Sequence, residues 1–131
     1  MIEIKFRVWD NNNNEMLTDK PGRGRVTEIL LNYHMGLLKD NPFSFMQNTG
    51  LKDKNGVEIY ESDKLRIIFC DDFSDDNISI EEGAIHEVEV YFMYGAWFFS
   101  TKDLDYLYAY SINEIADIEV IGNIYENKEL L

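Results

Sequence analysis

The sequence is poor in cysteine and histidine, the residues that form disulfides and many metal sites. It holds one cysteine, Cys70, among 131 residues. A single cysteine cannot form an intramolecular disulfide, which favours a reducing compartment. Cys70 follows the apolar run 67–69, so we interpret it as a buried structural thiol. The two histidines, His34 and His86, have no cysteine or acid at ligand spacing, which argues against a metal site. The sequence therefore predicts no catalytic residue, no cofactor and no bound metal.

Long hydrophobic runs are also missing. The apolar stretches fall far short of the roughly 18 residues that a membrane-spanning helix needs. The N-terminal run MIEIKFRVWD is interrupted by Glu3, Lys5 and Arg7 and does not resemble a signal peptide. We therefore expect a cytoplasmic protein that makes no contact with a membrane.

Basic residues are few and unevenly placed. The chain has 12 Lys and Arg against 25 Asp and Glu, a net charge of −13. Residues 1–39 hold six basic and five acidic residues, whereas residues 40–131 hold six and twenty. The acidic part should repel nucleic acid, because phosphate contacts need Lys and Arg. A nucleic-acid site, if the chain has one, would use the N-terminal basic residues Arg7, Lys20, Arg23 and Arg25.

The most acidic stretch is 71–82, with six acids and no basic residue. Clustered carboxylates can bind Ca²⁺ or Mg²⁺. Counted from Asp71 as an EF-hand loop, however, the sixth position is Asp76 where glycine is required, and Phe73 occupies a ligand position. We therefore expect a long, exposed, solvated loop, and whether it binds a divalent cation stays open.

The fold class follows from alternating apolar patterns and an aromatic content of 14%. We predict an α+β, mostly β chain that contains a small β-barrel. An N-terminal strand pair would pack on this barrel. The chain would be a single unit over 1–131, with a subdivision near Asn41-Pro42 into an N-terminal α+β part, 1–42, and a barrel part, 43–131.

Two local patterns, over residues 26–39 and at Gly122, bear on individual elements of the fold. Residues 26–39 place Val26, Ile29 and Leu30 at helical spacing, but the β-branched start and Gly36 favour a strand or an irregular segment. Near the C-terminus, Gly122 interrupts a strand pattern and predicts a bulge or bend.

The run 45–65 reads as a hairpin rather than as a catalytic loop. Gly50 and Asn55-Gly56 predict turns, Ile59 should fill the core, and Asp63 should bond to nearby backbone. We interpret the run as a structural motif. Replacing Asp53 or Glu58 by alanine should therefore change stability by no more than about 0.5 kcal/mol, as at ordinary surface positions.

Three blocks of the chain carry a family resemblance: IKFRVWD at 4–10, FMQNTGLKDKNGVEIYESDKL at 45–65 and EVIGNIYENKELL at 119–131. In this order they resemble the YopX family of phage and prophage proteins. The chain departs from the usual pattern at Asn48, Ser62 and Lys128, and the loss of glycine at Ser62 suggests a turn that does not need positive φ. The resemblance implies a small phage-encoded protein with a barrel-like, β-rich core, of which an SH3-like barrel is one form, and no assigned function.

We therefore predict a non-enzymatic phage accessory protein that acts through protein–protein contacts, as a homo-oligomer or with a host or phage protein. The surplus of aromatic residues on predicted strands supports an interface. Two alternatives stay open. One is a nucleic-acid module built on the N-terminal basic residues, and the other is an acidic mimic of DNA that inhibits a host protein.

Overall fold

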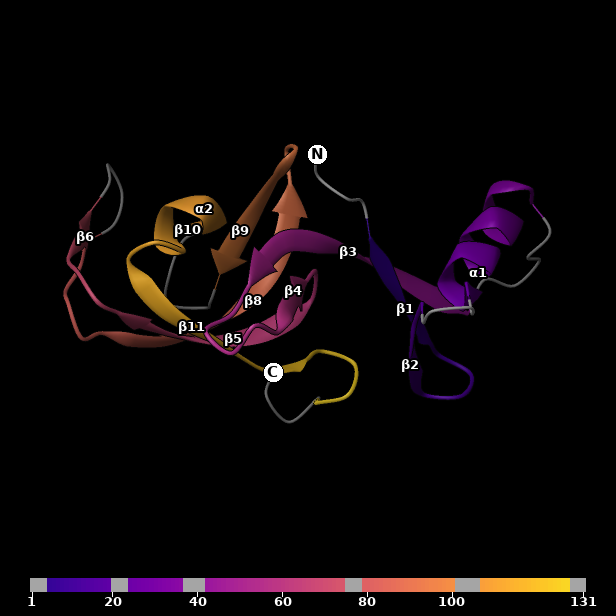
Figure 1. Cartoon of the computed structure of the whole chain (residues 1–131), viewed down its shortest axis with the longest axis horizontal. Helices are drawn as coiled ribbons and strands as arrows, with labels where there is room; N and C mark the ends of the chain where they lie inside the picture. Colours follow the sequence, from indigo (N-terminus) through magenta and orange to yellow (C-terminus); the bar gives the residue numbers. More distant parts are fainter. Residues whose placement is uncertain (1–4, 20–23, 37–41, 75–78, 101–106, 128–131) are drawn as a thin grey trace. The chain divides into compact units, whose positions relative to one another are not determined.

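The computed structural model describes residues 5–19, 24–36, 42–74, 79–100 and 107–127 (Figure 1). It forms two compact units, Met1–Asn48 and Thr49–Leu131. The elements are β1 (Phe6–Asp10), β2 (Glu15–Thr18), α1 (Arg25–His34), β3 (Phe43–Lys52), β4 (Glu58–Tyr60), β5 (Asp63–Phe69), β6 (Phe73–Ser74), β7 (Ser79–Ile80), β8 (Ile85–Met93), β9 (Ala96–Ser100), β10 (Leu107–Tyr108), α2 (Ala109–Ile112) and β11 (Ala116–Asn123).

The first unit is built around β1, which pairs antiparallel with β2 on one side and β3 on the other. Val8 lies opposite both Leu17 and Phe45. Strand β1 is buried on both faces, with Val8 0% and Trp9 6% exposed. A central strand loses both edges to its neighbours, so its side chains are more deeply covered than alternation alone predicts.

Helix α1 replaces the strand or irregular segment expected over 26–39, and this expectation was wrong. Val26 and Ile29 are buried in a cluster with Val8 and Leu17, so tertiary packing compensates for the modest helix propensity of the β-branched residues. Gly36 does not lie inside the helix. It adopts a φ of +70° just beyond the C-cap, where the left-handed conformation ends a helix and glycine is the favoured residue.

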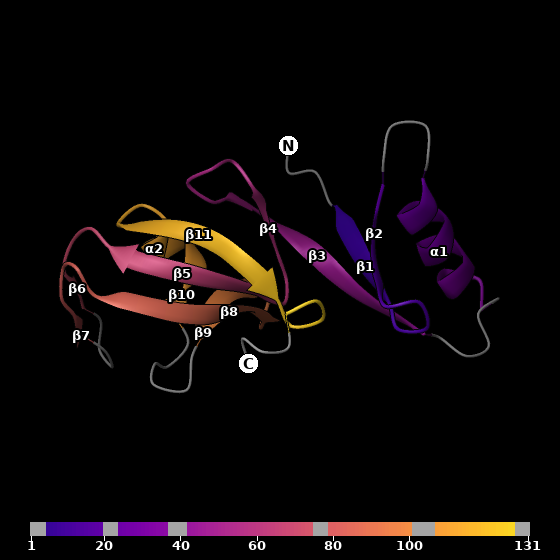
Figure 2. The same cartoon turned by 90° about the horizontal axis from the view of Figure 1, so that it is seen from below.

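The second unit contains a five-stranded antiparallel sheet in the order β10-β9-β8-β5-β11, curled into a half-barrel (Figure 2). Its concave side holds the larger core, to which α2 contributes Ala109 and Ile112. Leu65, Ile67 and Phe99 are at most 1% exposed. The two helices have only ten and four residues, so the predicted α+β, mostly β class is confirmed.

The acidic stretch 71–82 is not simply a loop. Its described residues include the short strands β6 and β7, paired through Phe73 and Ile80. Ile80 is only 5% exposed and joins the core of the second unit, and Phe73 packs against the same core, so two apolar side chains anchor this acidic stretch. Cys70 was expected to be buried, but it is exposed. It lies just beyond Phe69, the last residue of β5.

Along the chain, the boundary between the two compact units falls between residues 48 and 49. This is a few positions after the subdivision expected at residue 42. Strand β3 explains the difference, because its first part pairs with β1 and the strand then continues into the second unit. The predicted strand pair is present as β1 and β2, and its packing against the barrel stays a prediction. None of the helices in the described part of the chain has the length and apolar character needed to cross a membrane.

Candidate functional site

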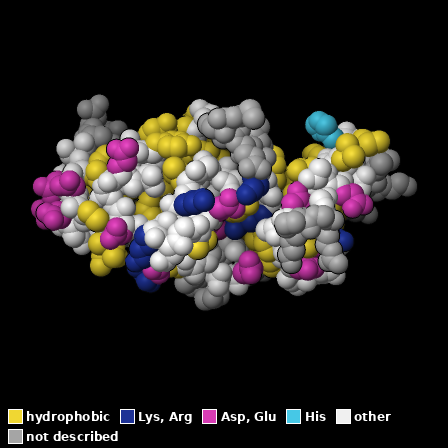
Figure 3. Space-filling view, viewed as in Figure 1, with side chains coloured by type: hydrophobic (Ala, Val, Ile, Leu, Met, Phe, Trp, Pro, Cys, Tyr) yellow, Lys and Arg dark blue, Asp and Glu magenta, His cyan; other side chains and the backbone are white. Residues whose placement is uncertain are grey.

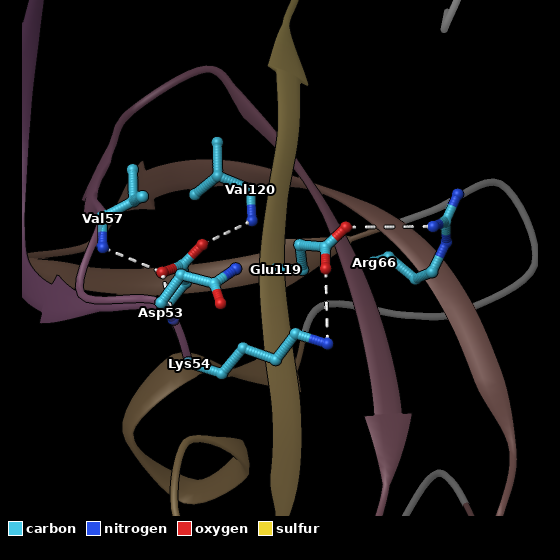
Figure 4. A network of polar contacts seen from close by, with 7 residues as sticks. Asp53, Lys54, Val57, Arg66, Glu119 and Val120 are labelled. Carbon is cyan, nitrogen blue, oxygen red and sulfur yellow. Dashed lines mark hydrogen bonds and ion pairs between the residues drawn. The ribbon is translucent and has the colours of Figure 1, made fainter.

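Asp53 belongs to the run 45–65 and directly follows the last residue of β3. Only 7% of its surface is exposed. One carboxylate oxygen, Oδ1, accepts hydrogen bonds from the N–H groups of Asn55 and Val57, both at 2.8 Å. The other, Oδ2, accepts the N–H of Val120 on β11 at 3.0 Å (Figure 4). One side chain therefore orders its own turn and ties that turn to a strand 67 residues away.

This geometry corrects the expectation that Asp53 is an ordinary surface residue. Burial acts to raise the pKa of Asp53, but the N–H donors of Val120, Val57 and Asn55 and the nearby charge of Lys54 outweigh it and hold the pKa below 3.8. A carboxylate that is ionised at neutral pH and saturated with backbone donors is a structural acceptor. It is poorly suited to transfer protons.

Other side chains of the run 45–65 also bond to nearby backbone groups. Asp63 is 1% exposed and accepts the N–H of Tyr60 at 2.8 Å, which is the backbone contact expected for it. The Thr49 hydroxyl donates to the carbonyl of Ile59 at 2.8 Å. Ile59 itself is fully buried.

In the run 45–65, positive φ angles occur at more positions than the sequence indicated. Gly56 has a φ of +81° in its turn. Gly50, with a φ of +83°, lies inside β3, so the turn predicted at Gly50 was wrong. Asn55 is not among the residues with positive φ, so the Asn-Gly pair is not a two-residue hairpin of type I′. Ser62 has a φ of +71°, so the suggestion that its turn does not need positive φ was wrong. Gly122 produces the expected bulge in β11, between Val120 and Gly122.

The N-terminal basic residues do not form a described patch. Arg7 is only 9% exposed, and its Nε donates to Met46 Sδ at 3.4 Å. It is buried because β1 is the central strand of the sheet. Arg25, at the start of α1, is exposed, whereas Lys20 and Arg23 lie outside the described residues. Of the four proposed residues the structure therefore describes two, Arg7, which is buried, and Arg25, which is exposed.

A feature that the sequence did not reveal is an apolar groove on α1, with a volume of about 530 Å³. We call it the α1 groove, and it is lined by Thr27, Leu30, Leu31, Tyr33, His34 and Phe45. Figure 3 shows hydrophobic side chains exposed over α1. Leu31 and Tyr33 are 57% and 52% exposed. The Tyr33 and Phe45 rings lie 5.4 Å apart, which joins the helix to β3.

The residues that line this groove could be grouped from the sequence only if the segment was taken to be a helix. Thr27, Leu31 and His34 recur at intervals of four and three, which places them on one face once residues 25–34 are helical. Val26 and Ile29 form the other, buried face. Because the segment was expected to be a strand or irregular, this second face could not be recognised.

The described residues contain no group of three or more His, Cys, Asp or Glu that could hold a metal ion. The question of cation binding by 71–82 stays open, because residues 75–78 lie outside the described part of the chain. His86, on β8, has its ring 6.0 Å from that of Phe69 at nearly right angles. This is an aromatic packing contact.

Comparison with curated proteins finds no match. Among solved structures, the chain is similar to the crystal structure of protein EF1440 from Enterococcus faecalis, with 27% sequence identity and a TM-score of 0.60. The similarity covers 100% of this chain and 99% of that one. The sequence profile of the family described as "YopX protein" matches residues 5–131, nearly the whole chain. The chain therefore belongs to the YopX family.

Proposed function

We propose that this chain is a non-enzymatic accessory protein of a phage or prophage, which acts through protein–protein contacts and associates with further copies of itself. The observation that carries the proposal is the α1 groove. Leu31, Tyr33 and Met35 are each more than half exposed at the end of a short helix whose other face is already buried. Contiguous exposed apolar surface of this kind marks an interaction site.

Charge favours a second copy of the chain as the occupant of the α1 groove. No lining residue is Lys, Arg, Asp or Glu. Residues 1–48 contain six basic and six acidic residues, whereas residues 49–131 contain six and nineteen. Two copies, each with a net charge of −13, repel one another through their second units. They meet without that repulsion where their first units face each other.

The state of the buried carboxylates supports a non-enzymatic role. A general acid or base works best with a pKa near the operating pH. The side-chain amide of Asn13 lowers the pKa of Asp10 against the effect of burial, with further help from backbone N–H groups and Arg25. The pKa of Asp53 is lowered as described above. Both carboxylates act as backbone acceptors in turns.

The alternative of a nucleic-acid module is weakened, because Arg7 packs against Met46 inside the first unit. Its guanidinium would have to leave the sheet to reach a phosphate. The mimic of DNA stays a prediction, since it depends on carboxylates at the spacing of phosphates.

The experiment is analytical ultracentrifugation of the full chain and of two variants at concentrations from about 1 to 100 μM, the range of weak to moderate association. Leu31→Glu places a charge in the α1 groove. Ile85→Glu is the matched control, because Ile85 is 61% exposed on β8, outside the groove. We expect the wild type and Ile85→Glu to form dimers or larger assemblies and Leu31→Glu to stay monomeric with unchanged circular dichroism.

A wild-type chain that is monomeric throughout would contradict self-association. Affinity purification of the tagged wild type and Leu31→Glu from infected host cells then tests the wider proposal. A protein partner captured by the wild type and lost in Leu31→Glu would preserve a role in protein–protein contact. A monomer that captures nothing would overturn the proposed function as a whole.

A further inference from the structure

A row of aromatic side chains crosses three strands of the half-barrel. Tyr91 on β8 lies opposite Phe98 on β9, and Phe98 lies opposite Tyr108 on β10. The rings of Phe98 and Tyr108 are 6.0 Å apart, and those of Tyr108 and Tyr110 are 5.7 Å apart. We call these four residues, Tyr91, Phe98, Tyr108 and Tyr110, the outer aromatic row.

The row lies on the face of the sheet that is turned away from the core. Successive side chains of a strand point to opposite faces. The neighbours Val90, Phe99 and Leu107 are at most 1% exposed, so the row projects to the other side. Tyr108 is 45% exposed, and core packing therefore does not account for its position.

The end of the row is fixed by a hydrogen bond. The Tyr110 hydroxyl donates to the carbonyl of Thr49 at 3.1 Å, while the residue stays 44% exposed. The contact holds the ring without burying it. A ring that is oriented in advance loses less conformational freedom when a ligand stacks on it.

Carboxylates border the row on the same outer face. Glu89 stands two residues before Tyr91 on β8, a separation of roughly 6.6 Å along the strand. Glu89 pairs with Lys64 at 3.2 Å. Beyond it, Arg66 is shared between Glu87 at 3.4 Å and Glu119 at 4.0 Å. Glu119 also pairs with Lys54 at 3.3 Å, so all three carboxylates already have a cationic partner, and a carboxylate can accept from more than one donor.

We propose that the outer aromatic row binds an arginine-rich segment of a partner protein. A guanidinium stacks on the face of a tyrosine or phenylalanine ring through cation–π attraction, and from Tyr91 it can reach the carboxylate of Glu89. The surplus of acid in residues 49–131 draws a cationic segment toward the second unit as a whole. The same charge disfavours stacked nucleic-acid bases, because their phosphates would meet these carboxylates.

This inference concerns a surface other than the α1 groove, and it does not depend on self-association. The test uses the full chain and measures fluorescence anisotropy of a labelled peptide of alternating Arg and Pro, nine residues long. A peptide of alternating Glu and Pro and a single-stranded oligo-dT of similar length serve as competing probes. The variant is Tyr108→Ala. Its matched control is Tyr94→Ala, because Tyr94 is 98% exposed at the β8–β9 turn, outside the row.

We expect the Arg peptide to bind and the Tyr108→Ala substitution to weaken binding about 5- to 10-fold, as the loss of one cation–π contact would. Tyr94→Ala should stay within about twofold of the wild type, since the bulk acidic charge is unchanged. Equal losses in the two variants would overturn the inference, because the peptide would then be held by net charge alone. So would tighter binding of the Glu peptide, or of oligo-dT, which would make the row a base-stacking surface.

Discussion

At the scale of single residues, Asp53 is the polar side chain that holds the turn after β3. Its carboxylate accepts three backbone N–H groups. Removing the carboxylate leaves these donors without their partner, and a buried donor left unsatisfied costs about 1–3 kcal/mol. The two turn donors, on Asn55 and Val57, lie at exposed positions and can turn to water. The N–H of Val120, within β11, is less able to do so.

We therefore predict that Asp53→Ala lowers the free energy of unfolding by about 2–3 kcal/mol, measured by urea denaturation. Asp71→Ala is the control, because Asp71 is an exposed acid of the same type, and it should change stability by no more than about 0.5 kcal/mol. Equal small effects would restore the surface interpretation of Asp53. Asp53→Asn keeps one acceptor oxygen and should fall between the two.

The same carboxylate predicts an acid dependence. The pKa of Asp53 in the folded chain lies below its ordinary value of 3.8, so its contribution to stability is full above pH 3.8 and is lost as the pH falls through the folded pKa. The urea midpoint of the wild type should therefore drop between pH 5 and pH 2 more steeply than that of Asp53→Asn, whose amide does not titrate. Parallel curves would show that Asp53 does not contribute to the acid response.

At the scale of elements, the strands were accessible to sequence reasoning and α1 was not. Strand β5 alternates fully buried and more exposed residues, so its pattern is visible in the sequence. In α1 the apolar residues are divided between the buried pair, Val26 and Ile29, and exposed positions such as Leu31, so their spacing does not mark one buried face. The Asn55 and Val57 bonds of Asp53 follow local turn chemistry and could be predicted. Its bond to Val120, far along the chain, could not.

The start of α1 offers a test of how the groove is held. Gly24, its N-cap, has no side chain to accept a hydrogen bond. Asp19 supplies the acceptor from outside the helix. Its Oδ1 accepts the N–H of Val26 at 2.8 Å, and its Oδ2 accepts the hydroxyl of Thr27 at 2.7 Å. This is a capping interaction made by a residue seven positions upstream of Val26.

We predict that Asp19→Ala destabilises the first unit by about 0.5–2 kcal/mol, the usual cost of losing an N-cap acceptor. The far-UV circular dichroism of α1 should weaken, and self-association through the α1 groove should weaken with it. Asp19→Asn is the control, since its amide oxygen can still accept the N–H of Val26. If Asp19→Ala leaves both signals at wild-type values, the cap does not position the groove.

At the scale of the whole molecule, charge separates the two units along the chain. Residues 1–48 carry no net charge from Lys, Arg, Asp and Glu, and the remaining residues carry the entire formal charge of −13. A surface of one sign keeps copies of a chain apart at long range. Any contact between copies must then be made where this field is weakest and where apolar surface is exposed. The first unit carries no net charge of its own, and it exposes apolar surface at the α1 groove.

The response of self-association to salt therefore distinguishes two kinds of dimer. Salt shortens the screening length from about 10 Å at 0.1 M to about 3 Å at 1 M, which removes the repulsion between acidic second units and leaves apolar contact in the α1 groove intact. We predict that the dimer dissociation constant falls by about threefold to tenfold between 0.1 and 1 M NaCl, measured by analytical ultracentrifugation. A head-to-tail dimer, in which Arg25 of one copy meets acidic residues of another, would instead weaken with salt, because its attraction is itself screened. Leu31→Glu should remain monomeric at both salt concentrations, so a variant that dimerises as well as the wild type in 1 M NaCl would place the contact elsewhere on the chain.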